Sequence, residues 1–185
     1  MNLGLGDRIM ESEQAKTLDV LQLAIQMEVE GKDFYQKASQ KSKNKLAKEL
    51  FQHLANEEDV HRKKFEEIYG ALKRGHNWPD VKPPSGQGKR LKSLFTKATK
   101  ALGSNIKVAE SELEAIKVAM DREIKSYNFY HSRSEQSSLP VEKRFYEALV
   151  GEERGHHLAL LDSHEYLSDP EGWFTKKEHW SLDGV

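Results

Sequence analysis

The apolar residues of the chain recur at helical spacing in four long stretches, which polar or breaker-rich segments separate. In each stretch the apolar positions step by three, four or seven residues, which places them on one face of an α-helix. The first stretch begins near Thr17, the second follows a polar turn at 39–44, the third begins near Leu113, and the fourth follows a turn at 136–140. The pattern therefore predicts four amphipathic helices.

A long connection divides these helices into two pairs. Residues 74–88 contain three glycines and three prolines, so no helix is expected there, whereas residues 91–102 can form a short helix inside a crossover of about residues 74–105. Two helical hairpins joined by a crossover predict an all-α four-helix bundle over about residues 15–168, within a single domain of residues 1–185.

The two ends of the chain lie outside this bundle. Residues 1 to about 14 show no clear periodicity and are expected to be irregular. The tail, residues 169–185, carries Trp173, Phe174 and Trp180. Large aromatic side chains favour burial, so the tail is expected to pack across the bundle end or against a second subunit.

A set of polar residues recurs in the two halves at one offset of 95 residues. The second helix of each pair carries a Glu-x-x-His motif, and the first carries a glutamate followed seven residues later by a tyrosine. The repeated residues are Glu28, Tyr35, Glu58 and His61 in the first half, and Glu123, Tyr130, Glu153 and His156 in the second. All eight fall on apolar faces, so we expect them to point into the bundle.

The two glutamates of each pair lie equally far from the turn that joins their helices. Residues 43 and 138 are the midpoints of the two pairs, and both fall inside the predicted turns. At a rise of about 1.5 Å per residue, each glutamate lies roughly 20 Å from its turn. Antiparallel packing therefore predicts four carboxylates in one layer, with the two histidines one helical turn beyond.

Four carboxylates in apolar stripes need compensating charge, because an unpaired buried carboxylate costs several kcal/mol or takes up a proton. The second, third and fourth stripes contain no lysine or arginine. Two divalent cations would balance four negative charges, and each histidine would supply one nitrogen. This is the donor set of a carboxylate-bridged di-iron or di-manganese site. The spacing alone does not choose between iron, manganese and mixed occupancy.

Other polar residues near these motifs receive a separate interpretation. Tyr35 and Tyr130 can donate hydrogen bonds to a metal-bound carboxylate on a facing helix, with plain core packing as the alternative. Tyr127 is expected to line the cavity. Glu57 lies about 100° around the helix axis from its neighbour and is interpreted as a surface charge. The same interpretation is given to Glu30 and Glu152, and His157 is expected to face solvent.

Composition removes several classes of function. The formal net charge of −1 gives no electrostatic reason to expect binding to nucleic acid or to a membrane surface. The absence of cysteine excludes disulfides, thiolate catalysis and cysteine-ligated metal centres in this chain. No apolar run approaches the roughly 20 residues that cross a bilayer, and the N-terminus does not resemble a secretory signal. We expect a cytoplasmic protein and a homodimer.

The phrases AIQMEVEGKDFY and LANEEDVH resemble the first two helices of the rubrerythrin-related proteins, within the ferritin-like superfamily. The resemblance covers about residues 15–168. It implies a ferritin-like bundle with two iron ions bound by Glu28, Glu58, His61, Glu123, Glu153 and His156. It also implies reduction of peroxide or O2 by electrons from an external donor, such as a separate rubredoxin or a reductase.

The chain departs from that family in two respects. Full-length rubrerythrins carry a C-terminal rubredoxin domain with an Fe(Cys)4 centre, which a chain without cysteine cannot form. They also have a further glutamate one turn after the ligand of the third helix, where this chain has Ser126. A symmetric site of six ligands is therefore expected.

Three functions remain open at this point. The first is a di-iron oxidoreductase that reduces peroxide or O2. The second is a ferroxidase or iron storage and delivery protein of the ferritin type, which would use the same site. The third is a helical module without catalysis, in which metal ions only hold the bundle together.

Overall fold

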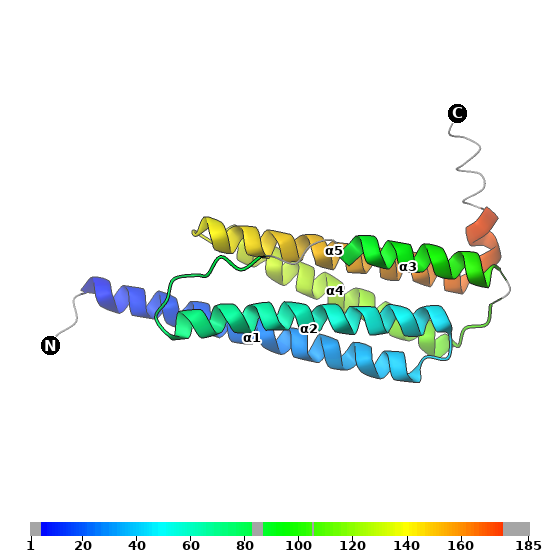
Figure 1. Cartoon of the computed structure of the whole chain (residues 1–185), viewed down its shortest axis with the longest axis horizontal. Helices are drawn as coiled ribbons and strands as arrows, with labels where there is room; N and C mark the ends of the chain where they lie inside the picture. Colours follow the sequence, from blue (N-terminus) through cyan, green and yellow to red (C-terminus); the bar gives the residue numbers. More distant parts are fainter. Residues whose placement is uncertain (1–4, 83–86, 105, 176–185) are drawn as a thin grey trace, which may run out of the picture.

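The computed structural model describes residues 5–82, 87–104 and 106–175, and it places most of them in five long helices. In chain order these are α1 (Leu5–Lys41), α2 (Lys45–Lys73), α3 (Gln87–Leu102), α4 (Glu110–Gln136) and α5 (Pro140–Ser168). α1 packs mainly on α2 and α4 mainly on α5, so two antiparallel hairpins lie side by side (Figure 1). The predicted all-α bundle of two hairpins is confirmed, and both predicted midpoints, residues 43 and 138, lie in the turns.

α1 begins earlier than the sequence pattern predicts. It is helical from Leu5, whereas the chain was expected to be irregular up to about residue 14. Residues 5–16 contain no proline, and most of them are good helix formers, so weak periodicity does not prevent a helix there. The Gln14 side chain also donates a hydrogen bond of 2.9 Å to the carbonyl of Leu72, which ties α1 to the end of α2.

A buried carboxylate fixes the two hairpins relative to each other. Glu112, in the first turn of α4, accepts hydrogen bonds from the backbone N–H groups of Lys43 at 2.7 Å and Asn44 at 2.9 Å. It also accepts from the N–H of Ala109 at 3.1 Å, which caps its own helix. Asn44 in turn caps α2 by accepting from the N–H of Ala47. These contacts join the first turn of α4 to the α1–α2 turn. They therefore fix the position of one hairpin relative to the other along the bundle axis.

Two hydrophobic clusters fill the bundle on either side of a polar layer. One cluster includes Leu54 of α2 and Leu160 of α5, and the other includes Phe65 of α2 and Leu149 of α5. Along each of α1, α2, α4 and α5, residues of one cluster precede the repeated glutamate and residues of the other follow it. The four glutamates therefore lie between two apolar blocks, which shield them from water.

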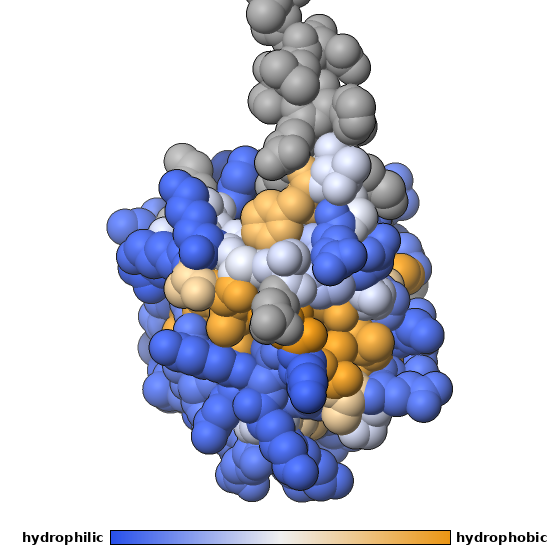
Figure 2. All heavy atoms as spheres, turned by 90° about the vertical axis from the view of Figure 1, so that its right-hand side faces the viewer, coloured by the Kyte–Doolittle hydropathy of each residue, from blue (hydrophilic) through white to orange (hydrophobic). Residues whose placement is uncertain are grey.

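α3 lies along α5 and α2 in one half of the bundle, and the start of the tail packs at the adjoining end (Figure 1). Leu91 and Phe95 of α3 are buried against α5 and α2. The Trp173 ring lies 5.5 Å from Phe95 and 5.3 Å from Tyr166, between ring centroids. Figure 2 shows hydrophobic side chains gathered at the centre of this end face, with polar residues around them. Trp173 and Phe174 therefore pack across the bundle end, and Trp180 lies outside the described residues.

None of the helices in the described part of the chain combines the length and the apolar composition that a membrane span requires.

Candidate metal centre

The six residues that repeat in Glu and Glu-x-x-His motifs meet in the layer between the two hydrophobic clusters. Each of the four long bundle helices contributes one glutamate, and α2 and α5 each add a histidine. All six side chains are buried, with exposed fractions of 5% or less: Glu28, Glu58, His61, Glu123, Glu153 and His156. The periodicity of the sequence is sufficient to place them, because each lies at the centre of its helix's apolar face.

Glu153 lies between the two histidines. The Nδ1 atom of His61 is 3.4 Å from Glu153 Oε1 and 3.6 Å from Glu28 Oε2. The Nδ1 atom of His156 is 3.8 Å from Glu153 Oε2 and 3.3 Å from Glu123 Oε2. The two imidazole rings are nearly parallel, with centroids 5.8 Å apart. Each histidine therefore has its own glutamate from the first helix of a hairpin, and the two share Glu153.

The potential ligand atoms of these six residues form two groups that have one residue in common. Within each group, one oxygen or nitrogen atom from every residue lies within 4.8 Å of the others. The first group is Glu58, Glu123, Glu153 and His156, and the second is Glu28, His61 and Glu153. Carboxylate oxygen and imidazole nitrogen are donors that suit iron and manganese. Two groups joined by one carboxylate suit a pair of cations.

Several polar atoms in this layer are buried without a hydrogen-bond partner among the described residues. They are Oε2 of Glu28, both carboxylate oxygens of Glu153 and both ring nitrogens of His61. A buried polar atom without a partner typically costs about 1–3 kcal/mol. The neighbouring groups relieve this cost only in part, because, within the described part of the chain, His61 is the one cationic neighbour of these oxygens at 3.4–3.6 Å and most of the others are carboxylates. Cations at the centre of the layer would coordinate these atoms, so the donor set fits a metal pair.

Burial raises the pKa of two of the glutamates. For Glu153 burial raises the pKa to about 8, and the negative charge of Glu123 acts in the same direction. Burial likewise raises the pKa of Glu58 well above its usual value, with the charge of Glu28 as the next cause. At neutral pH and without metal, Glu153 therefore holds a proton, and ionisation of Glu58 is disfavoured in the same way.

The other two glutamates stay ionised beside cationic histidines. Burial opposes ionisation of Glu28, but its hydrogen bond with Glu58 and the charge of His61 keep its pKa below the usual value. Burial also opposes a charge on His61, yet Glu28 raises the pKa of this imidazole to about 10. Glu123 and His156 form a second such pair, in which burial is again outweighed. Protons thus take the place that cations would occupy.

Two tyrosines connect the hairpins at this layer. The Tyr35 hydroxyl donates a hydrogen bond to Oε1 of Glu123, and the Tyr130 hydroxyl donates one to Oε1 of Glu28. Burial and these neighbouring carboxylates raise the pKa of both phenols well above the usual value, so both remain donors. Each bond runs from the first helix of one hairpin to the first helix of the other.

Glu57 is not a surface charge, so that interpretation is wrong. Its side chain is 3% exposed, and Oε2 lies 2.8 Å from Nε2 of His156. Oε1 lies 3.0 Å from Nε2 of His53. Burial opposes ionisation, but the hydrogen bonds of His156 and His53 lower the pKa of Glu57 to about 2. This carboxylate therefore holds the far nitrogen of the His156 ring while Nδ1 faces the other glutamates.

Glu152 is also buried, with an exposed fraction of 9%, so its interpretation as a surface charge is wrong as well. One of its oxygens lies within 4.8 Å of ligand atoms of Glu57 and His156. Glu30 is exposed, as predicted, whereas His157 is only partly exposed. The overlooked signal is the doubled glutamate, since Glu57 and Glu152 repeat at the same offset of 95 residues.

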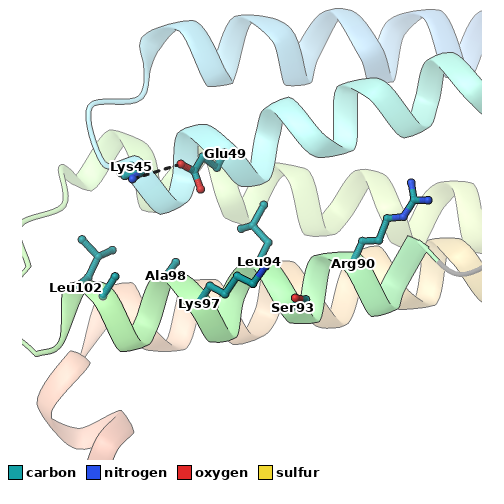
Figure 3. Close-up of a pocket in the computed structure, with 9 residues that line it drawn as sticks. Lys45, Glu49, Arg90, Ser93, Leu94, Lys97, Ala98 and Leu102 are labelled. Atoms are coloured by element: carbon teal, nitrogen blue, oxygen red, sulfur yellow. Dashed lines mark ion pairs between the residues drawn. The ribbon is translucent and has the colours of Figure 1, made fainter.

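Two hollows of the surface differ in their relation to this layer. A groove of about 730 Å³ runs between α2 and α3, lined by Lys45, Arg90, Leu94 and Lys97 among others (Figure 3). None of the six buried residues lines it. A smaller pocket of about 290 Å³ opens between α4 and α5, and Tyr127 lines it together with Glu123 and Glu153. The smaller pocket therefore leads to the carboxylates.

Comparison with known proteins gives two matches. A family model described as rubrerythrin matches residues 19–163. Among solved structures, a hypothetical protein from Pyrococcus furiosus is similar, with 23% sequence identity and a TM-score of 0.58. The alignment covers 81% of this chain and 89% of that chain, and at this identity it shows the fold alone. A comparison with curated proteins finds no match.

Proposed function

Because the chain belongs to the rubrerythrin family, we propose that it is a di-iron oxidoreductase that reduces peroxide or O2 with electrons from an external donor. The observation that carries this proposal is the duplicated set of buried carboxylates and imidazoles, whose unpartnered atoms face one another. Burial of these polar atoms without partners is costly in the metal-free state, so this set of residues is suited to binding cations.

The proposed ligands are the six residues of the buried layer, with Glu153 shared between the two ions. Glu28 and His61 would serve one ion, and Glu58, Glu123 and His156 the other. Iron ions bound there would pass between the ferrous and ferric states, and so would supply the two electrons that reduction of a peroxide requires.

The surrounding residues of the chain hold these ligands in place. Tyr35 and Tyr130 each fix one carboxylate from the opposite hairpin, and Glu57 fixes the ring of His156. Outer hydrogen bonds of this kind orient metal ligands and tune their basicity. The two hydrophobic clusters exclude bulk water on either side, which strengthens electrostatic interactions within the layer.

The electrons must come from another molecule in this proposal. The chain contains no cysteine, so it cannot hold an Fe(Cys)4 centre that would pass electrons to the buried layer. A separate redox protein or a reductase would take that role.

The test begins with metal analysis of protein purified without chelator. Metal-free protein is then loaded with ferrous iron without oxygen, and peroxide is added while the absorption of bound ferric iron is followed. We expect two iron ions per chain and rapid oxidation. Glu58→Ala should lose both, whereas Glu30→Ala, which changes an exposed glutamate, should keep both. A protein that binds no metal, or binds iron that peroxide does not oxidise, contradicts the proposal.

A further inference from the structure

The pocket between α4 and α5 joins the surface to the buried carboxylates. Its volume is about 290 Å³, and the buried side chains of Glu123 and Glu153 form part of its wall. The outer part is lined by Ile124, Tyr127, Asn128, Arg154 and His157. Ile124 is 44% exposed, so the pocket is open to solvent on this side.

The duplicated half of the bundle has different residues at the same positions. At the offset of 95 residues, Lys32 corresponds to Tyr127, Asp59 to Arg154 and Arg62 to His157. Lys32 Nζ lies 2.7 Å from Asp59 Oδ1, and Arg62 Nη2 lies 3.0 Å from the same atom. An ion cluster therefore bridges α1 and α2 where the other hairpin has its pocket.

α1 also approaches α2 closely beneath this ion cluster. Gly31 has no side chain, and a Cβ atom there would lie 3.3 Å from Cδ of Glu58. The corresponding residue on α4 is Ser126, which is only partly buried. The first hairpin is thus packed tightly over its glutamates, whereas the second hairpin leaves space over Glu123 and Glu153.

We propose that the symmetric carboxylate layer has a one-sided opening, and that the pocket between α4 and α5 binds a small hydroperoxide. This inference rests on the proposed function, and it adds the route and the size of the hydroperoxide that the route admits. Arg154 and Asn128 offer hydrogen-bond donors to peroxide oxygens, while Ile124 and the Tyr127 ring offer an apolar wall. The volume lies at the low end of ligand pockets, so it suits hydrogen peroxide or a small organic hydroperoxide.

The first test measures access without any redox reaction. The chain has no cysteine, so a single introduced thiol can be blocked selectively. Ile124→Cys places the thiol in the pocket wall, Val29→Cys places it at the equivalent position of the first hairpin, and Val118→Cys places it on an exposed face of α4. Each variant is loaded with cobalt(II), and the rate of azide binding is read from the cobalt absorption before and after reaction with a bulky thiosulfonate.

We expect blocking to change the rate of azide binding at one position only. Blocking Cys at position 124 should slow azide binding by about tenfold or more, and a phosphine reductant should restore it. Blocking position 29 or 118 should leave the rate within about twofold. An unchanged rate at 124, or equal slowing at 29, overturns the one-sided opening while the metal site stands. Failure of the unmodified protein to bind cobalt would instead overturn the proposed function and this inference with it.

The second test addresses the size of the hydroperoxide in iron-loaded protein. Ile124→Trp narrows the pocket, and Val118→Trp is its matched control on the same helix. The rate of ferrous oxidation by tert-butyl hydroperoxide, relative to that by hydrogen peroxide, should fall about tenfold in the first variant and stay constant in the second. A constant ratio in both variants would show that organic hydroperoxides do not use this pocket.

Discussion

Glu57 shows how a residue next to one proposed ligand, Glu58, can act through another, His156. Its carboxylate bonds to Nε2 of His156, while Nδ1 of the same ring faces Glu123 and Glu153. Sequence periodicity assigns one buried face to a helix, and on this helix it predicts burial of Glu58 but not of Glu57. In the bundle, α2 is covered by α5 as well as by α1, so a residue 100° around its axis is also buried. Periodicity could not reveal this second covered face.

Loss of this contact should weaken metal binding. Glu57→Gln removes the charge that holds the His156 ring, and outer-sphere changes of this kind typically cost about 10- to 100-fold in metal affinity. A competition titration with a chromophoric chelator measures it. Glu67→Gln, an exposed change on the same helix, should leave the affinity unchanged. Equal affinities in both variants would show that Glu57 does not position the ring.

The tyrosines give a matched pair of variants within one aromatic cluster. Tyr130 donates to buried Glu28, whereas the hydroxyl of its neighbour Tyr146 finds no partner among the described residues. Tyr130→Phe should lower the free energy of unfolding of the metal-free protein by about 1.5–3 kcal/mol, because a charged acceptor loses its donor. Tyr146→Phe should be neutral or slightly stabilising. Urea unfolding measures both, and equal effects would contradict the assigned hydrogen bond.

At the scale of the helices, the sequence predicts the middle of each helix better than its first and last residues. Regular apolar spacing located the four bundle helices, and Pro140 marked the start of α5. The start of α1 was missed because residues 5–16 have helix propensity without a strong apolar stripe. Gly75 and Gly103 have positive φ values of 76° and 62°, which end α2 and α3 in a conformation that glycine adopts readily. The packing of α3 on α5 and α2 depends on long-range contacts that no local pattern contains.

Alanine substitutions at two helical glycines should have different effects, one on stability and the other on metal binding. Gly151 on α5 has open space where the Cβ atom of an alanine would lie, so Gly151→Ala should stabilise the protein by about 0.5–1 kcal/mol. At Gly31 the added methyl group would press on the Glu58 carboxylate, so Gly31→Ala should weaken metal binding even if the helix gains propensity. Thermal unfolding and metal titration separate the two effects. Metal affinity that is unchanged in Gly31→Ala would contradict the close approach of α1 to the site.

At the scale of the whole molecule, duplication explains why so much could be predicted. One offset relates four glutamates, two histidines and two tyrosines, and antiparallel hairpins bring equivalent positions to one level. The structure preserves this symmetry in the buried layer and breaks it at the surface, where Asp59 and Arg154 occupy equivalent positions with opposite charge. The repeat therefore predicts the layer well. It could not predict which hairpin leaves a pocket, because that depends on side-chain packing.

The metal-free molecule should lose stability as the pH rises. The pKa of Glu153 is about 8 in the folded protein against an ordinary value of 4.5, and that of His61 is about 10 against 6.5. Both are raised, so the folded state binds these protons more tightly. Their stabilising contribution is complete at low pH, and it is lost between 4.5 and about 8 for Glu153 and between 6.5 and about 10 for His61. Glu57 acts oppositely, since its pKa of about 2 gives a contribution that is lost in acid.

Urea unfolding across this range, with and without a divalent cation, measures the effect. The free energy of unfolding of the metal-free protein should fall from about pH 6 to pH 9, and added manganese should stabilise the protein most at the alkaline end, because cations replace the lost protons. Glu153→Gln keeps a neutral side chain at every pH, so it should flatten the part of the decline between 4.5 and about 8. A metal-free protein whose stability is constant from pH 6 to 9, or one that manganese stabilises equally throughout, would contradict the assignment of protons to this layer.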